Sequence, residues 1–579
     1  MIEISNRADC CGCGACRQIC PVNCIKMEAD QEGFLFPRVD KTACINCGAC
    51  ERVCPILNTE TFEQSCTVID NAACDQSSPA VREPSAAKTP GAATGVYGKP
   101  KALGGWIKDE KIRYDSSSGG AFTLFAGHIL ANGGIVFGAA LGEDLTVRHI
   151  AVENKEDLAK LRGSKYVQSS IGNTYAEVKE NLRQGRRVLF TGTPCQAAGL
   201  HSFLGNKKYE NLYIVDFICH GTPSPKVFSD YMAYMEKKCG DRIVNFRFRL
   251  KDKNWNQTGL QLGTAAETAG GKFIRHYPAF RDPFMNGFLD DIYLRDSCYD
   301  CRFKTLPKYY ADITIADFWG VDKCDPGLND GKGTSLVLLN SEHGKELFDA
   351  VKDNFYYKEV EFEKAIRRNK SLIKSVKPNR RRAAFFADYS SRPYEQVQRK
   401  YMNPIIWAVH KAAGMAWNII EAIVRAVLTP VLTRINPSWD EAGWEALFQF
   451  IRFAMVGVTN VLVSYTINIT TLLILKHTVP GFRFDYIIAN TTAFILSVLW
   501  SFHWNSSKVF DAGRTPRDKL KALLRSYASY AFSGIVLNNV LSTFWIHVAG
   551  VSKFLAPLLN IPVTMPVNFF ILKKWAFRK

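Results

Sequence analysis

Two cysteine runs of identical spacing constrain this chain more than any other feature of its sequence. The pattern C-x2-C-x2-C-x3-C-P occurs twice, at Cys10, Cys13, Cys16, Cys20 and Pro21 and again at Cys44, Cys47, Cys50, Cys54 and Pro55. Loops of this spacing wrap three thiolates around one [4Fe–4S] cluster, while the fourth cysteine reaches the other cluster. We therefore expect two clusters, one on Cys10, Cys13, Cys16 and Cys54 and one on Cys44, Cys47, Cys50 and Cys20. Zinc and disulfides are the alternatives, but zinc sites rarely use doubled four-cysteine runs.

Small residues beside the cysteines support the same interpretation. Gly14 and Gly48, each followed by alanine, let the backbone approach cluster sulfides, whereas Cys11 and Cys24 break the spacing and are not expected to be ligands. Residues 1–58 resemble a bacterial two-cluster ferredoxin over their whole length. The resemblance implies a small α+β fold that passes single electrons.

Cysteine usage and charge indicate the surroundings of the chain. The 579 residues include 18 cysteines, and the N-terminal MIEISNRADC has no apolar stretch of a secretory signal. We therefore expect a reducing compartment with metal or redox use of the cysteines. The formal charge is +18, and basic residues gather late, around Arg380, Arg381 and Arg382 and beside apolar runs. This distribution favours an anionic membrane surface, and no nucleic acid, as the partner.

Composition divides the chain into five segments. Residues 59–98 are rich in Ala, Pro, Ser and Thr and are expected to be a linker between residues 1–58 and an α/β domain at 99–378. In that domain strand-like runs such as RVLFTG, NLYIVDF, ADITIADF and TSLVLLN alternate with helical stretches. Residues 379–447 are basic and amphipathic, which is typical of a packed connecting helix or of a helix lying on a membrane. Four tryptophans stand in this segment: Trp407, Trp417, Trp439 and Trp444.

A second group of cysteines stands where sites usually form in an α/β domain. Cys195 follows the strand RVLFTG, Cys219 ends the strand YIVDF, and Cys298 and Cys301 form a C-x2-C pair. Ligands of open α/β sheets bind beyond the carboxyl ends of the strands. These four thiols are therefore candidates for a third [4Fe–4S] cluster, and buried structural thiols are the alternative.

Two loops carry weaker signals for an anion. The loop SSSGGAF, with Ser118, Gly119 and Gly120, precedes a helix-like stretch, and a Gly-rich turn at a helix N-terminus exposes N–H groups to phosphate. The loop LRGSKYVQS places several polar side chains together, which suits a pyrophosphate; its members are Arg162, Gly163, Ser164, Lys165, Tyr166 and Gln168. Ordinary loops are the alternative for both. No GxGxxG follows a strand, so a Rossmann site is not supported.

Six blocks in order resemble one family. SSSGGAF, LRGSKYVQS, VLFTGTPCQAAGL, DFICHGTPSP, CYDCRFK and DITIADFWG are similar to the coenzyme F420 hydrogenase/dehydrogenase beta-subunit family over residues 95–345. The resemblance implies FAD, a [4Fe–4S] cluster on Cys195, Cys219, Cys298 and Cys301, and two-electron chemistry on an organic substrate. A flavin couples one-electron clusters to two-electron chemistry. His220 is a candidate proton donor, or only a hydrogen-bond donor to the cluster.

Residues 448–579 are expected to cross a membrane. Four stretches lack charged residues and are about long enough to span a ~30 Å hydrocarbon core, at 453–475, 486–507, 526–552 and 554–572. Basic residues gather after the second and fourth stretches, at Lys508, Arg514, Arg517, Lys519, Lys521, Arg525, Lys573, Lys574, Arg578 and Lys579. The other two loops carry only Lys476, Arg483 and Lys553. Both termini should then be cytoplasmic, in a multi-pass protein of the cell (inner) membrane.

The membrane stretches carry amides and a sign of duplication. Phe502 and Phe510 align with Phe569 and Phe577, which suggests two parallel two-helix halves. The amides either join helices or contact a polar substrate; they are Asn460, Asn468, Asn490, Asn538, Asn539 and Asn560. FQFIRFAMVGVTNVLVSYTIN and KKWAF resemble the GtrA-like family of four-helix membrane proteins. That resemblance implies a role with polyprenyl-linked sugars in surface-polysaccharide assembly.

These observations predict three domains and one leading function. The expected domains are an α+β ferredoxin, an α/β flavin and iron–sulfur domain, and an all-α four-helix membrane domain. We expect a membrane-bound oxidoreductase that moves electrons between clusters, a flavin and an organic substrate, with a redox protein or coenzyme as its partner and a polyprenyl-linked sugar as a candidate substrate. The alternative is a translocase component with an accessory redox part.

Overall fold

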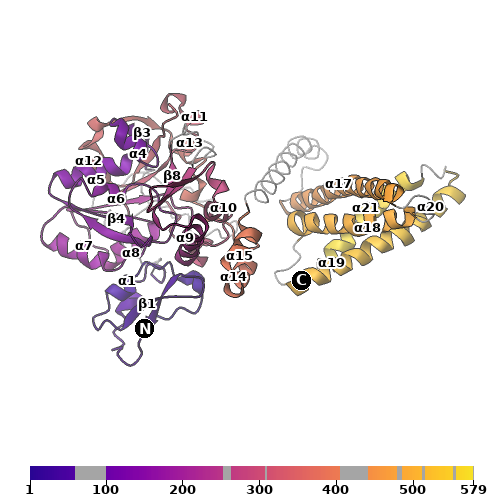
Figure 1. Cartoon of the computed structure of the whole chain (residues 1–579), viewed down its shortest axis with the longest axis horizontal. Helices are drawn as coiled ribbons and strands as arrows, with labels where there is room; N and C mark the ends of the chain where they lie inside the picture. Colours follow the sequence, from indigo (N-terminus) through magenta and orange to yellow (C-terminus); the bar gives the residue numbers. More distant parts are fainter. Residues whose placement is uncertain are drawn as a thin grey trace, which may run out of the picture. The chain divides into compact units, whose positions relative to one another are not determined.

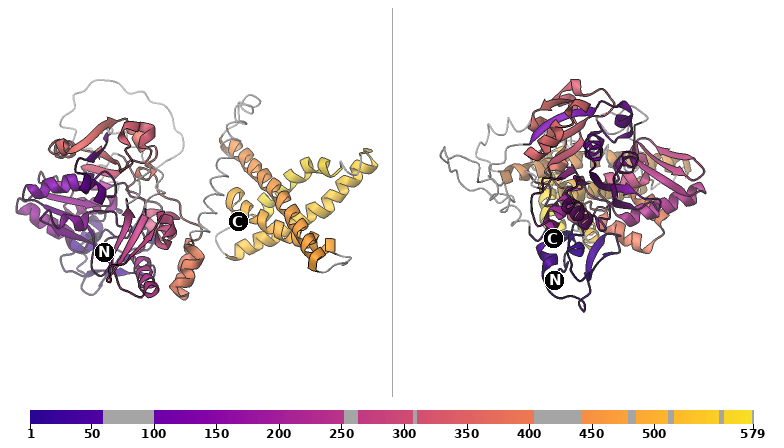
Figure 2. Two further views of the ribbon diagram at one scale, coloured as in Figure 1. Left: turned by 45° about the horizontal axis from the view of Figure 1, so that its top comes forward. Right: turned by 90° about the vertical axis from the view of Figure 1, so that its left-hand side faces the viewer.

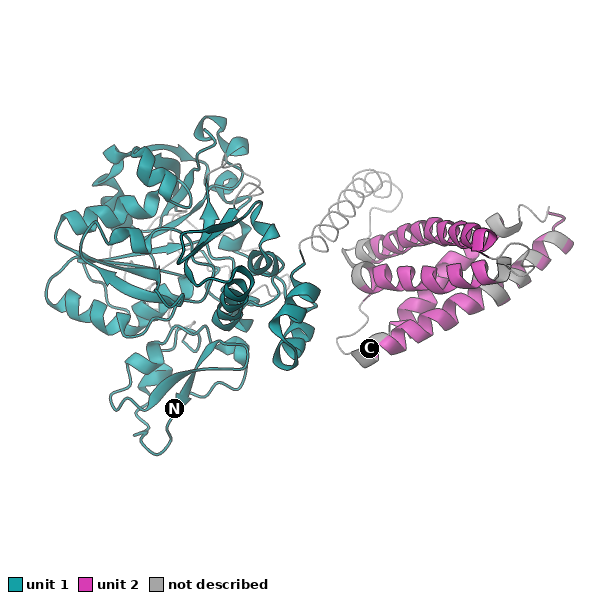
Figure 3. Ribbon diagram, in the orientation of Figure 1, with its two compact units in different colours: residues 1–409 teal, residues 410–579 magenta. Residues whose placement is uncertain are grey.

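The computed structural model describes residues 1–58, 100–251, 263–306, 310–403, 441–478, 485–510, 516–551 and 556–577. These residues divide into two compact units, residues 1–409 and 410–579 (Figure 3). The expected linker at 59–98 and Trp407, Trp417 and Trp439 lie outside the described residues, as does the Trp444 side chain.

The first 58 residues form a small α+β segment. Strands β1 (Ile25–Ala29) and β2 (Leu35–Val39) pair antiparallel. Each cysteine run leads into a short helix, α1 (Ala15–Gln18) or α2 (Ala49–Arg52). A 3-10 turn, η1 (Arg7–Asp9), precedes the first run. Gly14 and Gly48 start α1 and α2 at φ of 73° and 68°, a left-handed conformation that favours glycine.

An eight-stranded mixed sheet forms the middle of the first unit (Figure 1). Its strand order is β13-β3-β12-β11-β7-β6-β4-β5. The bounds are β3 Lys101–Ile107, β4 Ile135–Leu141, β5 Val147–Val152, β6 Val188–Gly192, β7 Leu212–Phe217, β11 Ile313–Asp317, β12 Ser335–Leu339 and β13 Phe355–Val360. Strands β4, β6, β7 and β11 run parallel, so their carboxyl ends meet at one edge. The expected strands RVLFTG, NLYIVDF, ADITIADF and TSLVLLN correspond to β6, β7, β11 and β12.

Helices cover both faces of this sheet. Alternate residues of β6 point to opposite sides, so Val188 and Phe190 join a core with α7 and α8, while Leu189 joins a core with α5 and α12. The helix bounds are α4 Glu110–Asp115, α5 Ala121–Ala131, α6 Leu158–Leu161, α7 Thr174–Arg183, α8 Pro194–Phe203, α9 Pro225–Cys239, α10 Pro283–Leu289, α11 Val321–Cys324, α12 Glu342–Asp349 and α13 Phe362–Ile366. A small antiparallel sheet of β8 (Ile243–Leu250), β9 (Gly263–Thr268) and β10 (Phe273–His276) stands beside them.

The ferredoxin segment packs directly on the α/β domain. Its Ile2, Ile25, Val53 and Ile56 share one apolar core with residues of α7, α8 and β6. Helix α1 contacts both α7 and α8 (Figures 1 and 2). The two expected domains therefore form one compact body, in which the ferredoxin segment packs against α8, the helix that carries Cys195.

The boundary expected at residue 379 differs from the structure. Residues 379–403 include α14 (Arg382–Ser391) and α15 (Tyr394–Tyr401), and α15 packs against α9. Phe385 and Tyr389, one helical turn apart, are buried in the second core of the first unit. The basic composition of this stretch predicted a linker, because the charged residues around Phe385 and Tyr389 obscured the apolar pair in the sequence.

The second unit is helical throughout its described residues. Its helices are α17 Glu441–Thr478, α18 Asp485–Trp504, α19 Pro516–Ala531, α20 Asn538–His547 and α21 Ala556–Ile571. One of them, over Ala446–Thr478, has the length and the mean hydropathy (1.7) to cross a membrane, as far as the described residues go. Many apolar side chains of this unit are exposed, Val461 and Tyr465 among them, as lipid contact requires. For the other three expected spans, crossing remains a prediction.

The suspected duplication has a structural counterpart. Phe502 stacks on Phe577 with ring centroids 5.8 Å apart, and Phe510 packs on Phe569 and Phe577 in one core. A π-helix follows each member of the first aligned pair at the same offset, Asn505–Val509 after Phe502 and Leu572–Ala576 after Phe569. Both features support two related halves.

Candidate functional site

The ferredoxin cysteines gather as two sets of four. Cys10, Cys13, Cys16 and Cys54 line one small cavity, which we call the first cysteine set. Cys20, Cys44, Cys47 and Cys50 line another, the second cysteine set. These are the two groups that the spacing predicts. Cys24 lies beside the second set, with its Sγ 3.4 Å from that of Cys20.

The second group of cysteines also meets in one place. Cys195, at the start of α8, Cys219, after β7, and Cys298 and Cys301 line one cavity, the third cysteine set. They meet because β6 and β7 are parallel neighbours that end at the same edge. Thr222 donates its backbone N–H to Cys298 Sγ at 3.4 Å, and Thr193 Oγ1 lies 3.1 Å from Cys195 Sγ.

The chemistry of these sets fits clusters better than single ions. In the described parts of the chain no three His, Cys, Asp or Glu side chains stand close enough to hold one metal ion. Burial raises the pKa of Cys16 and of Cys301 to about 12, because desolvation and neighbouring thiols disfavour the thiolate. Iron binds the thiolate, so a bound cluster must supply the positive charge that offsets this cost.

Cys11 is a thiol whose place the spacing did not reveal. It lines both the first and the third cavity, and Ile56 does the same. The pKa of Cys195 lies well above its ordinary value, first because of its hydrogen bond with Cys11 and then because of desolvation. Cys11 therefore separates two sets of cluster cysteines.

A larger pocket of about 520 Å³ adjoins the third cysteine set. Thr193, Cys219, Gly221 and Thr222 line both the pocket and the third cavity. Most of the predicted anion-binding residues line the pocket, namely Ser118, Gly120, Arg162, Gly163, Ser164, Lys165 and Tyr166. The volume is within the usual range for a cofactor or substrate site.

Two predicted residues lie elsewhere. Gly119 lies below the pocket wall, where its N–H donates to Ser335 Oγ at 3.0 Å. Gln168 points to the ferredoxin segment: its Nε2 donates to the Cys11 carbonyl at 3.1 Å, and its Oε1 accepts from Arg295. Gln168 therefore contacts the joint between the two domains.

Lys165 is the most strongly perturbed cation of the pocket. Its Nζ donates to the carbonyls of Lys160, Leu161 and Arg162 at 2.9 to 3.1 Å, where α6 ends. Desolvation lowers its pKa to about 7. An anion in the pocket would offset that cost, which is why such a lysine fits a phosphate site.

The pocket also holds polar atoms that sequence reasoning missed. Arg249, from β8, donates Nη1 to Asp317 at 2.7 Å, and its side chain is 5% exposed. Its Nε and Nη2, like Nδ2 of buried Asn369, have no hydrogen-bond partner among the described residues. Such donors call for an acceptor from a ligand. The one indication of these donors in the sequence was Asp317, the partner of Arg249, which stands at the end of a strand in the block DITIADFWG.

Two histidines line the pocket and differ in burial and in hydrogen-bond partners. His149 is buried, with Nε2 donating to the Thr191 carbonyl at 3.0 Å and Nδ1 2.7 Å from Ser169 Oγ. Burial lowers its pKa to about 4, so it stays neutral at pH 7. His220, next to Cys219, has its Nε2 2.6 Å from Asp291 Oδ1. The Asp291 contact fixes the orientation of the His220 ring.

The fold and the site together define a class of protein. Such a protein has an α/β redox domain with three cysteine sets and a ligand pocket. The same chain also contains a two-cluster ferredoxin segment and a helical, membrane-type region.

The comparisons confirm the resemblances in all three parts. Residues 102–174 and 185–365 match the N-terminal and C-terminal models of the coenzyme F420 hydrogenase/dehydrogenase beta subunit. Residues 9–57 match the 4Fe-4S dicluster domain, and residues 452–577 match the GtrA/DPMS transmembrane domain. Three parts of one chain are thus similar to a 4Fe-4S dicluster domain, to the coenzyme F420 hydrogenase/dehydrogenase beta subunit and to a GtrA/DPMS transmembrane domain.

One solved structure is similar to the redox part. It is a chain of the xenon-derivatised F420-reducing [NiFe] hydrogenase complex from Methanosarcina barkeri, at 19% identity and a TM-score of 0.34. The similarity covers 48% of this chain and 88% of that chain. No curated protein matches the chain.

Proposed function

We propose that this protein is a membrane-bound iron–sulfur flavoprotein oxidoreductase that carries electrons through its three cysteine sets to a flavin and an organic substrate. The observation that carries the proposal is that neighbouring sites share residues. Cys11 and Ile56 line both the first and the third cavity, and Cys219 and Thr193 line both the third cavity and the pocket. Sites that share walls are close enough for electrons to pass between them.

The residues present fit three [4Fe–4S] clusters. The first set supplies Cys10, Cys13, Cys16 and Cys54, the second supplies Cys20, Cys44, Cys47 and Cys50, and the third supplies Cys195, Cys219, Cys298 and Cys301. The dicluster match supports the first two. Lys304 stands beside the third set, its Nζ donating to the His220 carbonyl at 3.1 Å, and so adds a positive charge.

The pocket fits a flavin with its phosphates near Lys165 and Arg162. When bound, the flavin would exchange single electrons with clusters and electron pairs with an organic substrate. Lys165, Arg162 and the loop before α5 would hold the phosphates. The unpartnered N–H groups of Arg249 and Asn369 would donate hydrogen bonds to ring oxygens or substrate oxygens. His220 would hold or release a proton at Nδ1, with its ring oriented by the contact between Nε2 and Asp291.

A link to surface polysaccharide follows from the second unit. The GtrA/DPMS match and the exposed apolar helices support a place in the membrane. We propose a sugar or polyprenyl-linked glycan as the substrate class. The same match favours one alternative, in which the membrane unit moves the glycan and the redox unit is accessory.

Iron content tests the cluster proposal. Protein purified without oxygen should hold about twelve iron atoms per chain, because each [4Fe–4S] site takes four. Replacing both Cys298 and Cys301 by Ser should leave about eight. The control is Cys324→Ser, since Cys324 on α11 lines none of the three cavities. Eight irons in the parent protein, unchanged by the double substitution, would contradict the third cluster.

A further inference from the structure

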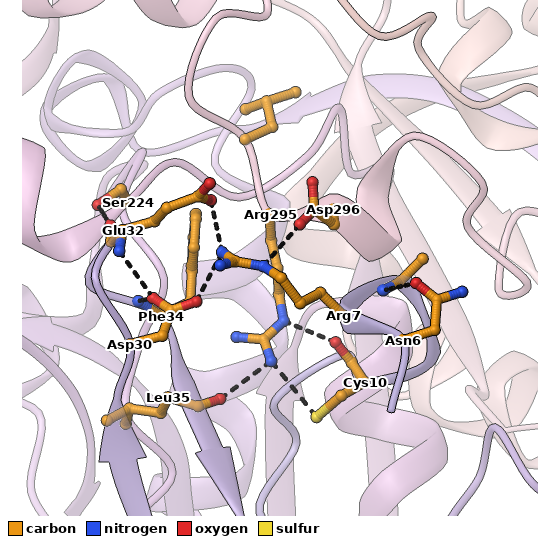
Figure 4. Close-up of polar contacts among 12 residues, drawn as sticks. Asn6, Arg7, Cys10, Asp30, Glu32, Phe34, Leu35, Ser224, Arg295 and Asp296 are labelled. Carbon is orange, nitrogen blue, oxygen red and sulfur yellow. Dashed lines mark hydrogen bonds and ion pairs between the residues drawn. The ribbon is translucent and has the colours of Figure 1, made fainter. Parts of the chain in front are cut away.

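Arg295 is a buried cation at the joint between the two redox domains. It is 1% exposed. Its Nε donates to the Cys10 carbonyl at 2.7 Å and Nη2 to the Leu35 carbonyl at 2.9 Å (Figure 4). Nη1 donates to Gln168 Oε1 at 3.1 Å. Nη2 also donates to Cys10 Sγ at 3.3 Å. Four of its five N–H groups are therefore used in these bonds, and one bond reaches a cysteine of the first set.

No carboxylate of the described residues forms an ion pair with Arg295. The adjacent Asp296 pairs instead with Arg7 and Arg382, at 2.9 Å each. A buried charge without a counter-charge costs several kcal/mol. The guanidinium also lies over the rings of Phe34 and Phe36. Among its hydrogen-bond acceptors, the Cys10 sulfur is the one that becomes negative, as a ligand of an anionic cluster. The burial of Arg295 is thus explained by a charge on the first set.

Gly12 lies against the Arg295 guanidinium in a backbone conformation that favours glycine. Its φ is +71°, and a Cβ at this position would stand 2.9 Å from Arg295 Nη1 and 2.7 Å from Gln168 Nε2. Only glycine lets the loop of the first set come this close to the guanidinium. The loop and the cation are therefore fitted to each other.

The cations beside the second set are exposed or paired. Arg52 Nη1 donates to the Cys47 carbonyl at 2.9 Å in an exposed position, and the N-terminal ammonium of Met1, which lines the cavity, pairs with Glu51 at 2.9 Å. Among the described contacts neither donates to a sulfur of the set, and the Ile2 amide donates to Cys50 Sγ at 3.3 Å. Cys47 is exposed, and Ile45 beside it is 60% exposed. The second set is therefore the outer one, and it lacks the buried positive charge of the first.

A buried cation favours the reduced form of a cluster. Reduction adds an electron to an already negative group, and a charge-assisted N–H···S bond in a low dielectric stabilises the added charge. Hydrogen bonds to cluster sulfurs and local charge are among the terms that set cluster potentials. Arg295 should thus raise the potential of the first cluster relative to the second.

We propose that Arg295 raises the potential of the first cluster above that of the second, so that the inward step between them is downhill. Electrons that enter at the exposed second cluster from a low-potential one-electron carrier then move inward past Cys11 to the third set and the pocket. In a reduction of the organic substrate, two carrier molecules each lose one electron, and the substrate gains two electrons together with two protons from water. The inference rests on the proposed function, since it requires clusters in the cysteine sets.

Redox titration of the full-length, cluster-loaded protein, followed by EPR, tests this role. In Arg295→Gln one midpoint should become more negative by the equivalent of a tenfold or larger change in the reduction equilibrium, about 59 mV for one electron. Arg295→Lys keeps the charge but cannot reach all four acceptors, so the same midpoint should fall less. Arg382→Gln is the matched control, because Arg382 pairs with Glu32 and Asp296 at the same joint and contacts no cysteine.

Each outcome decides the proposal. Unchanged midpoints in Arg295→Gln, or an equal shift in Arg382→Gln, would overturn it. If Arg295→Gln does not keep its iron, Arg295→Lys decides, and an unchanged midpoint there overturns the proposal. A stopped-flow readout separates direction from packing: transfer from a reduced viologen to the pocket should slow about tenfold, while the reverse transfer should not slow. The midpoint potentials are measured without substrate. A shift in Arg295→Gln would therefore support this inference even if the oxidoreductase proposal failed. Unchanged potentials in a protein that does act as an oxidoreductase would contradict this inference alone.

Discussion

Lys165 is the residue on which flavin retention should depend most. Lys165→Met removes a buried ammonium whose three N–H groups are held by carbonyls at the end of α6 and whose charge would attract the flavin phosphates, so flavin affinity should fall roughly tenfold. Affinity of the parent protein should also fall as the pH rises through about 7, where the lysine loses its proton, and this pH dependence should vanish in the variant. Fluorescence of released flavin measures both.

Lys160→Met is the control for this change. Lys160 is on α6, whose last carbonyls Lys165 contacts, but its side chain is exposed and pairs with Asp157 at 2.6 Å. It should retain flavin like the parent, with all clusters loaded. Equal loss of flavin in the two variants would contradict the assignment of the phosphate end to Lys165.

The sequence revealed residues whose role depends on local spacing. The eight ferredoxin cysteines were readable from one repeated pattern, and the third set was readable because parallel strands end at one edge. Arg295 and Cys11 were not readable. Their positions depend on packing between segments nearly the whole redox unit apart, and no local pattern encodes which loop meets which. Arg249 was missed for the same reason, since β8 belongs to a separate small sheet.

Helix α8 should tolerate no side chain at Gly199. A Cβ there would stand 2.9 Å from Cys13 Cβ and 2.9 Å from the Tyr175 hydroxyl oxygen, so Gly199→Ala must push the ferredoxin segment away. We expect a lower thermal midpoint and a loss of iron from the first set. Gly127 on α5 is the matched control, because nothing lies within 4 Å of its Cβ position. Gly127→Ala should stabilise by about 0.5–1 kcal/mol through helix propensity; two alanine variants that melt alike would contradict the close approach.

The helices of the second unit make a topology prediction. Basic residues follow the second and fourth expected spans, so reporters inserted near Arg514 or fused after Lys579 should be active only in the cytoplasm. Reporters near Lys476 or Lys553 should report the outside. An external signal at the C-terminus would mean that the number of spans is not four. Helices α17, α18 and α21 overlap the first, second and fourth expected spans, whereas the third expected span is divided between α19 and α20. Helix α19 begins at Pro516 and carries Arg517, Lys519, Lys521 and Arg525, which were expected in the loop before that span. The charged loops at Arg483, Arg514 and Lys553 lie outside the described residues.

At the scale of the whole molecule, one chain joins a redox unit to a membrane unit. Fusion keeps the two at high effective concentration, which helps most when the substrate is itself bound to the membrane. A water-soluble coenzyme would gain little from such a tether. The formal charge of +18 would favour a place near anionic headgroups, where a polyprenyl phosphate carries its sugar. The amides of the expected spans could hydrogen-bond sugar hydroxyls, and Asn560 among them is buried.

The link to surface polysaccharide is tested by comparing three strains: the parent, a deletion, and one that carries the Cys298→Ser, Cys301→Ser double substitution. The double substitution removes electron transfer but leaves the membrane unit intact. If the redox unit acts on a polyprenyl-linked glycan, the lipid-linked intermediates and the finished polymer should change in composition in both altered strains under anaerobic growth. A change in the deletion alone would favour the translocase alternative, because the membrane unit then suffices. Unchanged glycans in both strains, with the protein expressed in the parent, would contradict the polysaccharide link while leaving the iron, flavin and potential measurements to stand separately.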